Sequence, residues 1–269
     1  MPAIHIARLR KQAVELAEYF FEPNRFDFHF TQLLDFYSNR TIRPDKRTNS
    51  KLQIKVYKVQ DPILKIILAE ISPLAAQNPN AVLKLAKLLW NEPVLEKRIF
   101  AARLLGLLPT KDALSTLQLI EDWTQNCHDD LLLEEFAAHP LLAIHEENWD
   151  FYLEYMDKWL NCDSRILIRQ SLISISTILK ERSIIDLPPI FKLLSPHFSE
   201  PEFTLRSLLK PIFKSLVRQS PDEMMFLIRQ IYDSHETRNK NFIWLLKQNL
   251  EYFPESHLES LETMISAKH

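Results

Sequence analysis

The sequence of 269 residues contains one glycine, Gly106, whereas an average content of roughly 7 % would give about nineteen. Glycine adopts positive φ angles most easily, and both tight hairpin turns and phosphate-binding loops depend on such angles. The shortage therefore argues against β-sandwiches, dinucleotide-binding α/β proteins and P-loop enzymes, and it excludes a GxSxG nucleophile elbow. Sixteen prolines and short polar turns indicate helices instead.

Cysteine and long apolar runs are also scarce. Cys127 and Cys162 are the only cysteines and neither belongs to a CxxC pair, so we expect no disulfide framework and a cytoplasmic location. No run of about 18 apolar residues is present, so we expect no membrane span. Residues 1–21 lack the apolar core of a secretory signal and predict an amphipathic helix.

The net charge of −2 conceals a strong segregation of charge along the chain. Residues 112–157 contain twelve acids and no Lys or Arg, whereas all 33 bases and the other 23 acids lie outside this stretch. A nearly neutral total therefore does not describe the field that a partner meets at one face. The acidic stretch 112–157 is a candidate contact for a basic protein partner.

Apolar residues recur at spacings of three and four along most of the chain, which is the period of an amphipathic α-helix. Prolines at positions 62, 79, 93 and 221 stand where helices would begin, since proline is tolerated in the first turn. We predict further helix breaks at Pro73, Pro140 and Pro196. Gly106 beside Pro109 is expected to end a helix or to allow close packing.

Consecutive helices joined by short turns pack antiparallel. From about residue 60 onward the helix pairs repeat at about 35–40 residues, the period range of HEAT-type α-solenoids. We therefore predict an all-α fold, a HEAT-like α-solenoid of antiparallel helix pairs, with a compact multi-helix bundle as the alternative. A single domain is expected over residues 1–269, with aromatic and basic N-terminal helices and a loop in 1–58 and helical repeats in 59–269.

Seven cations and one acid occupy residues 40–58. Such a cluster is typical of phosphate binding, although a solvated loop and helix face would carry the same residues. The candidate phosphate-binding residues of this segment are Arg47, Lys51, Lys55 and Lys58.

A second basic group is more regular, and we call it the cationic strip: Arg206, Lys210, Lys214 and Arg218. Each step of four residues moves only about 40° around a helix, so the four cations share one face about 18 Å long. Such a strip can follow a nucleic-acid backbone, or it can be the outer face of an ordinary amphipathic helix. Pro211 lies inside the predicted helix and should kink it.

Other chemistry is weakly supported. His128, His139 and His145 lie near carboxylates but lack HxxxH spacing, so we expect neither a metal site nor a cofactor. Asp129 and Asp130 could include a general base, although a solvated acidic helix explains them equally. The aromatic residues of segment 19–37 could stack on bases, or they could fill a core between helices.

From about residue 57 to residue 252 the order of segments resembles the bacterial alkylpurine DNA glycosylases of the AlkD type, which are built from HEAT-like repeats. The similar segments are Val-Gln-Asp-Pro-Ile-Leu at 59–64, Leu-Trp-Asn-Glu-Pro at 89–93 with Glu-Lys-Arg-Ile-Phe-Ala-Ala at 96–102, Trp-Leu-Asn-Cys-Asp-Ser-Arg at 159–165 with the helix that continues to 170, and Ser-Pro-Asp-Glu at 220–223.

The resemblance implies a basic concave DNA groove and a cleft in which two Trp and one Asp, beside an Arg, hold the lesion nucleotide. In that family the Asp stabilises the cationic sugar as the glycosidic bond breaks. The family pattern Trp-Trp-Asp-x-x-Asp matches residues 127–132 here, where both Trp are absent and Leu132 stands in place of the final Asp. The Trp expected in the basic helix falls on Pro211, and the Arg is kept as Arg169.

The resemblance therefore implies a protein that binds double-stranded DNA weakly and whose glycosylase activity is lost or altered. Its DNA-binding residues would be Arg165, Arg169, the cationic strip and the basic residues of segment 40–58. Two alternatives stay open. One is a HEAT-type scaffold that meets a protein partner through residues 112–157, and the other is an active alkylpurine glycosylase that uses Asp129 or Asp130.

Overall fold

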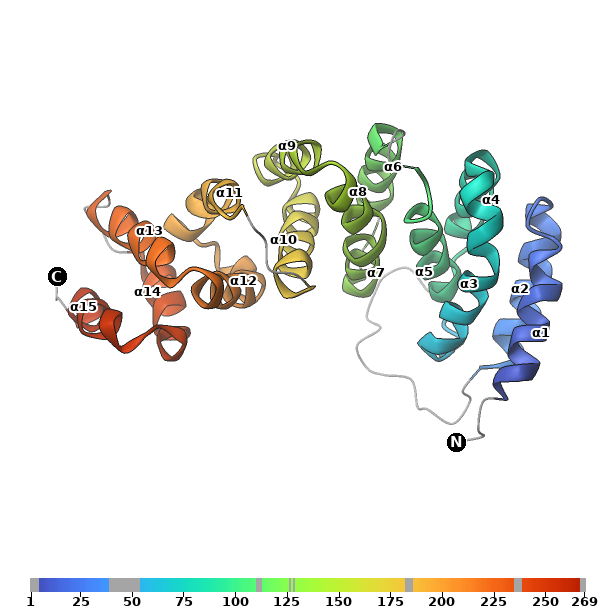
Figure 1. The fold of residues 1–269 in the computed structure, drawn as a ribbon, viewed down its shortest axis with the longest axis horizontal. Coiled ribbons are helices and arrows are strands. Elements are labelled where there is room, and N and C mark those ends of the chain that lie inside the picture. Colours follow the sequence, from blue (N-terminus) through green and yellow to red (C-terminus); the bar gives the residue numbers. More distant parts are fainter. Residues whose placement is uncertain are drawn as a thin grey trace. The chain divides into compact units, whose positions relative to one another are not determined.

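The computed structural model describes residues 5–38, 54–109, 113–125, 127, 129–181, 186–234 and 239–266. Helices dominate these residues (Figure 1), which contain an isolated β-bridge between Lys55 and Val94 and no strand. The predicted all-α class is confirmed. Among the helices of these ranges, none is long and apolar enough to cross a membrane.

The chain divides into two compact units, residues 1–148 and 149–269. Unit 1 contains α1 (Ile6–Ala17), α2 (Pro23–Phe36), α3 (Asp61–Gln77), α4 (Pro79–Asn91), α5 (Leu95–Leu105), α6 (Ala113–Gln125), α7 (Asp130–Phe136), the π-helical η2 (Ala137–Leu141) and α8 (Leu142–Glu147). Unit 2 contains α9 (Trp149–Leu160), α10 (Arg165–Glu181), α11 (Pro188–Ser199), η3 (Phe203–Leu205), α12 (Arg206–Gln219), α13 (Pro221–Ser234), α14 (Lys240–Lys247), η4 (Leu250–Tyr252) and α15 (Glu255–Ser266). The expected single domain stays a prediction.

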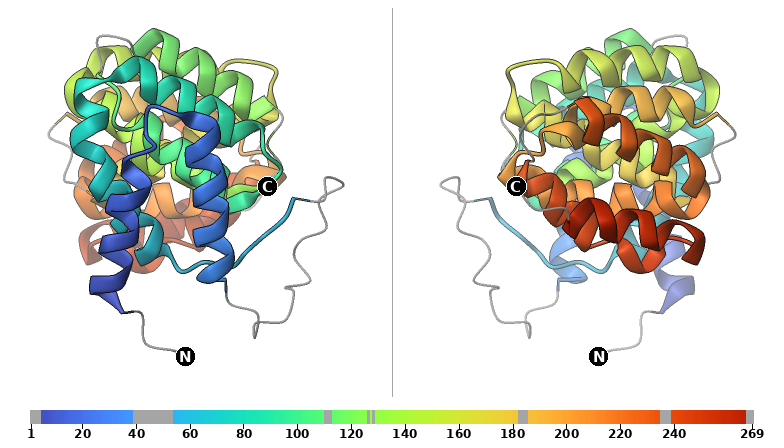
Figure 2. Two further views of the ribbon diagram at one scale, coloured as in Figure 1. Left: turned by 90° about the vertical axis from the view of Figure 1, so that its right-hand side faces the viewer. Right: turned by 90° about the vertical axis from the view of Figure 1, so that its left-hand side faces the viewer.

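Within each unit the helices pack mainly against those that come next, or next but one, in the chain. In unit 1 the packing runs from α1 to α3 to α5 to α7, with α2 and α4 against this layer (Figure 2, left). In unit 2 one layer contains α10, α12 and α14, and the other contains α9, α11 and α13 (Figure 1). Packing between near neighbours in sequence is the arrangement of an α-solenoid of helix pairs, as predicted.

Pro62, Pro79 and Pro221 lie in first turns as predicted, and so does Pro23 of α2. Pro93 does not begin a helix, because α5 starts two residues later at Leu95. The predicted breaks at other prolines are wrong. Pro73 and Pro196 lie inside α3 and α11, within about one turn of the last residue, where a missing N–H disturbs only the end of the helix. Pro140 lies inside η2, whose wider turn replaces the hydrogen bond that proline removes from an α-helix.

Gly106 follows the last residue of α5 with a φ of −69°, so its backbone does not require glycine. A Cβ at this position would lie 3.0 Å from the backbone carbonyl carbon of His139 and 3.0 Å from its Cβ. The end of α5 therefore approaches η2 so closely that an added methyl group would require His139 to move. Gly106 both ends a helix and permits close packing, as the sequence indicates.

Helix α5 carries buried charges, although most charged side chains of soluble proteins are exposed. Glu96 and Lys97 are each 3 % exposed. Lys97 Nζ lies 2.5 Å from Asp27 Oδ1 of α2. The Glu96 carboxylate accepts the backbone N–H groups of Tyr57 at 3.1 Å and Lys58 at 2.6 Å, which fastens the segment before α3 to α5.

Arg103 joins three helices of unit 1. Its Nε and Nη2 atoms donate to the two carboxylate oxygens of Glu135 in α7 at 2.7 and 2.6 Å, and Nη2 also donates to Asp61 of α3 at 2.5 Å. His139 Nε2 lies 3.3 Å from the Glu135 carboxylate. Burial acts to raise the pKa of Glu135, but the hydrogen bonds from Arg103 and His139 outweigh it and hold this pKa below its usual value.

We expect Arg103→Met to lower the free energy of unfolding by about 3–5 kcal/mol, because it leaves the Glu135 charge buried without its partner. The double variant Arg103→Met/Glu135→Leu should recover most of this loss, since Asp61 keeps Lys65 at 2.9 Å. The pKa of Glu135 is lower in the folded state than in the unfolded state. The stabilisation that ionised Glu135 gives the fold is therefore present above its unfolded pKa and disappears as the pH falls below roughly 4. Urea unfolding at several pH values checks both statements, and equal stability of wild type and Arg103→Met would contradict them.

We expect Gly106→Ala to lower the free energy of unfolding by about 1–3 kcal/mol, because the new methyl group forces η2 away from α5. The substitution favours the helical backbone on its own, so any loss measures the packing conflict. The measurement is chemical denaturation of the full chain. A stability equal to or above that of wild type would show that η2 accommodates the methyl group without cost.

Candidate nucleic-acid interface

The cationic strip lies along α12, and the opposite face of that helix is buried. The buried residues of α12, all at most 1 % exposed, are Leu209, Ile212, Phe213, Leu216 and Val217. The four cations are partly or fully exposed, and α12 contains no acidic residue. The predicted division into an apolar and a cationic face is therefore confirmed, and the helix continues through Pro211.

Arg206, the first member of the strip, contacts two aromatic rings. Its Cζ atom is 4.0 Å from the ring centroid of Phe203 in η3 and 4.5 Å from that of Trp244 in α14. A guanidinium whose faces stack on rings keeps its N–H donors in its own plane, at the edge of the stack. The rings orient Arg206 without neutralising its charge.

The other three cations contact η4 and the residue after α14. Lys210 Nζ donates a hydrogen bond to Gln248 Oε1 at 3.0 Å. Lys214 Nζ and Arg218 Cζ lie 4.2 and 4.8 Å from the ring centroid of Tyr252. These neighbours are an amide and a phenol ring, which hold the cations in place and leave their positive charge uncompensated.

No carboxylate among the described residues forms an ion pair with a member of the strip. Four like charges along one helix repel one another, so such an arrangement is not explained by the stability of the fold. A polyanion placed along the helix would relieve this repulsion, because its phosphates would lie near the cations.

Arg165 and Arg169 lie in α10, which packs along α12. Arg165 is exposed and Arg169, one turn later, is partly buried. Helices α10 and α12 belong to the same layer of unit 2. Arg165 and Arg169 therefore lie on the helix beside the one that carries the strip.

The candidates of the basic segment belong to unit 1 or lie outside the described residues. Arg47 and Lys51 are outside them. Lys55 Nζ donates to the Tyr57 hydroxyl at 2.7 Å and lies 4.1 Å from the centre of that ring. Lys58 has a φ of 59°, and its backbone N–H donates to the Glu96 carboxylate, as described above.

Asp129 has a structural role at the start of α7. It is the N-cap residue, and its Oδ1 accepts the backbone N–H of Leu131 at 3.0 Å. Asp130 is exposed in the first turn of the helix, where the helix dipole stabilises a negative charge. Leu132, which replaces the Asp of the family pattern, is fully buried.

Two tryptophans lie near α7, but they belong to the core. The rings of Trp90 in α4 and Trp123 in α6 stack at 4.4 Å and both contact Phe136 of α7. Both indoles are buried and hence form no open cleft. Of the histidines, His139 pairs with Glu135 and His128 lies outside the described ranges, within which no three His, Cys, Asp or Glu side chains gather as metal ligands do.

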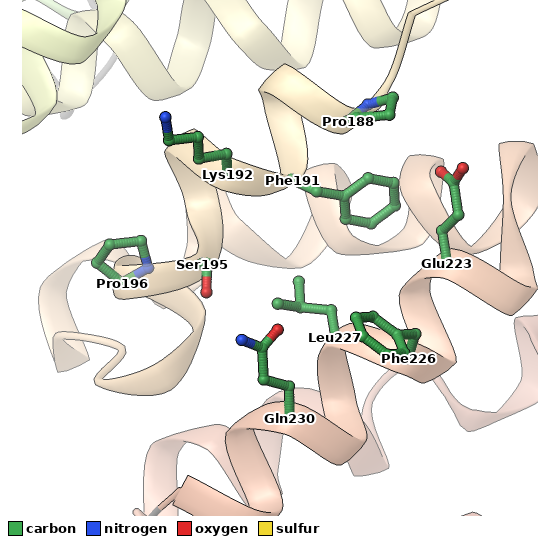
Figure 3. Close-up of a pocket in the computed structure, with 9 residues that line it drawn as sticks. All are labelled: Pro188, Phe191, Lys192, Ser195, Pro196, Glu223, Phe226, Leu227 and Gln230. Carbon is green, nitrogen blue, oxygen red and sulfur yellow. The ribbon is translucent and has the colours of Figure 1, made fainter.

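A groove of about 530 Å³ lies between α11 and α13, in the other layer of unit 2 (Figure 3). Phe191, Phe226 and Leu227 form its apolar part, and Lys192 and Glu223 lie at its edge.

Phe203, Trp244 and Tyr252 were not predicted from the sequence as part of the candidate interface. Phe203 had a usable signal, because it stands three residues before Arg206 and a helical turn would place it beside that residue. Trp244 and Tyr252 had none, since only the packing of α14 and η4 against α12 brings them to the strip.

We expect Asp129→Ala to lower the free energy of unfolding by about 0.5–2 kcal/mol, because α7 loses its N-cap. Asp129→Ser should keep most of the stability, since a hydroxyl oxygen also accepts the N–H of Leu131. Thermal and urea unfolding of both variants distinguish the two effects. Equal losses in both variants would show that the cap is not what Asp129 supplies.

Comparison with known proteins gives one match. A model of a family described as DNA alkylation repair enzyme matches residues 34–207, which is more than half of the chain. No curated protein and no solved structure matches the chain. The matched range includes Arg165 and Arg169 and ends at the start of the cationic strip.

Proposed function

Because the chain belongs to the DNA alkylation repair enzyme family, we propose that it is a HEAT-like repeat protein that binds double-stranded DNA and has lost or altered base-excision activity. The observation that carries the proposal is the cationic strip of α12, in which no cation pairs with a described carboxylate. Arg165 and Arg169 lie on α10, the helix that packs along α12. Cys127 and Cys162 are free thiols, in keeping with the cytoplasmic location expected from the sequence.

The affinity of such a surface comes from the release of cations condensed on the phosphates. Each phosphate contact on duplex DNA contributes about −0.9 to the slope of log K against log salt, so four contacts give about −3.6. This term does not depend on base sequence, and it supports weak binding of many sequences rather than recognition of one.

The residues of α7 favour a loss or change of the base-excision activity that the resemblance implies. A cationic sugar is stabilised by a carboxylate beside it, and the position that the family pattern assigns to this carboxylate holds the buried Leu132. Asp129 caps α7, so its use as a catalytic group would remove an acceptor from Leu131. We therefore expect no release of free methylated base from alkylated DNA. Release that is lost in Asp130→Asn would instead favour an active glycosylase.

A scaffold function has less support. The acidic stretch 112–157 and the groove between α11 and α13 are the surfaces that it would use. No contact of the described residues identifies a partner for either surface, so neither adds a function to the proposal.

We expect Lys214→Gln and Arg218→Gln each to weaken duplex binding and to reduce the steepness of the salt dependence by about 0.9. The measurement is fluorescence anisotropy of a labelled duplex between about 50 and 200 mM salt. Lys192→Gln is the matched control, because Lys192 is an exposed lysine of unit 2 on α11, in the other layer. Absent binding at low salt, or binding that salt does not weaken, would contradict the proposed function.

A further inference from the structure

Phe203 is an aromatic residue that contacts a cation and is exposed at the same time. It is 70 % exposed and begins η3, the short helix that leads into α12. The Arg206 Cζ atom lies over the Phe203 ring at 4.0 Å from its centroid, and over the Trp244 ring at 4.5 Å from that centroid. The Arg206 guanidinium therefore contacts Phe203 while most of Phe203 stays open to solvent.

Arg206 and Phe203 together supply a group that can bind the phosphate of a nucleotide and a group that can bind its base. The Arg206 guanidinium directs its N–H donors along its own plane, where a phosphate can accept two of them. The open face of Phe203 lies next to this position and can stack on a flat, apolar surface. A row of cations beside exposed aromatic faces is the combination with which proteins bind single strands.

The pairing state of the DNA decides whether Phe203 contributes. In an intact duplex both faces of each internal base are covered by neighbouring bases, so the ring finds no partner and only the phosphates are bound. An unpaired base can leave the stack and expose a face. Stacking of one base on an aromatic side chain contributes roughly 1–3 kcal/mol, which corresponds to roughly 5- to 150-fold in affinity.

We propose that Phe203 stacks on an unpaired nucleobase, so that unit 2 binds DNA containing an unpaired nucleotide more tightly than fully paired DNA. The inference rests on the proposed DNA binding and adds to it the form of DNA that is preferred. Glu202 precedes Phe203, and its carboxylate bonds to the Thr204 hydroxyl at 3.3 Å. That carboxylate is exposed at the edge of the site, so it disfavours a phosphate on its own side and leaves the side of Arg206 for the strand.

The test compares two labelled duplexes of equal length, one fully paired and one with a single-nucleotide bulge of 2-aminopurine, against the full chain. The wild type should bind the bulged duplex roughly 5- to 150-fold more tightly, with a change in 2-aminopurine fluorescence on binding. Phe203→Ala should abolish both the preference and the fluorescence change, and Phe203→Tyr should keep them.

Phe226→Ala is the matched control. Phe226 is 71 % exposed, almost the same as Phe203, but it lies on α13 in the other layer of unit 2. Its substitution should leave the preference unchanged, and melting curves of both Ala variants should match that of wild type because neither ring is buried.

Two results separate this inference from the proposed function. Equal affinity of the wild type for both duplexes, or a preference that persists in Phe203→Ala, overturns the inference while salt-dependent binding of both DNAs upholds the proposed function. If neither DNA binds at low salt, the proposed function fails and the inference fails with it.

Discussion

The structure of unit 1 depends on the buried guanidinium of Arg103. It holds Glu135 of α7 with two hydrogen bonds and Asp61 of α3 with a third, so three successive members of one layer meet at a single side chain. Burial of these charges is costly, and the hydrogen bonds of Nε and Nη2 to the two carboxylates offset it, although Nη1 is buried without a hydrogen-bond partner among the described residues. Directional bonds of this kind fix the angle and register between helices, which apolar packing alone leaves freer. The layer therefore has one arrangement of α3, α5 and α7.

Unit 2 uses charge in the opposite way. The cations of α12 are partly or fully exposed, lie beside aromatic rings and an amide, and form no ion pair with a described carboxylate. Aromatic neighbours orient cations at little cost to their charge, whereas a carboxylate would orient and neutralise them together. Side chains held in this way would lose less conformational entropy in the proposed binding of DNA.

Much of the fold could be predicted from the sequence, and less of the interface. The spacing of three and four residues predicted the apolar and cationic faces of α12, because these faces depend only on the sequence of that one helix. Breaks at Pro73, Pro140 and Pro196 were wrong, because the effect of a proline depends on its distance from the helix end and on local π geometry. Trp244 and Tyr252 were not predicted, since only packing between helices brings them to the strip. Asp129 was ambiguous because one carboxylate suits both a cap and a general base.

The π-helical segment η2 has a geometric consequence for the helices that it joins. Helix α7, η2 and α8 follow one another without a turn, and the hydrogen bonds of η2 span five residues instead of four. The extra residue shifts the phase of the following helix by about 100°, since each residue of an α-helix turns by that angle. The side of α8 that faces the core is therefore not the continuation of the side of α7 that does so. The buried face of this continuous helical segment therefore changes direction at η2, where His139 approaches Gly106.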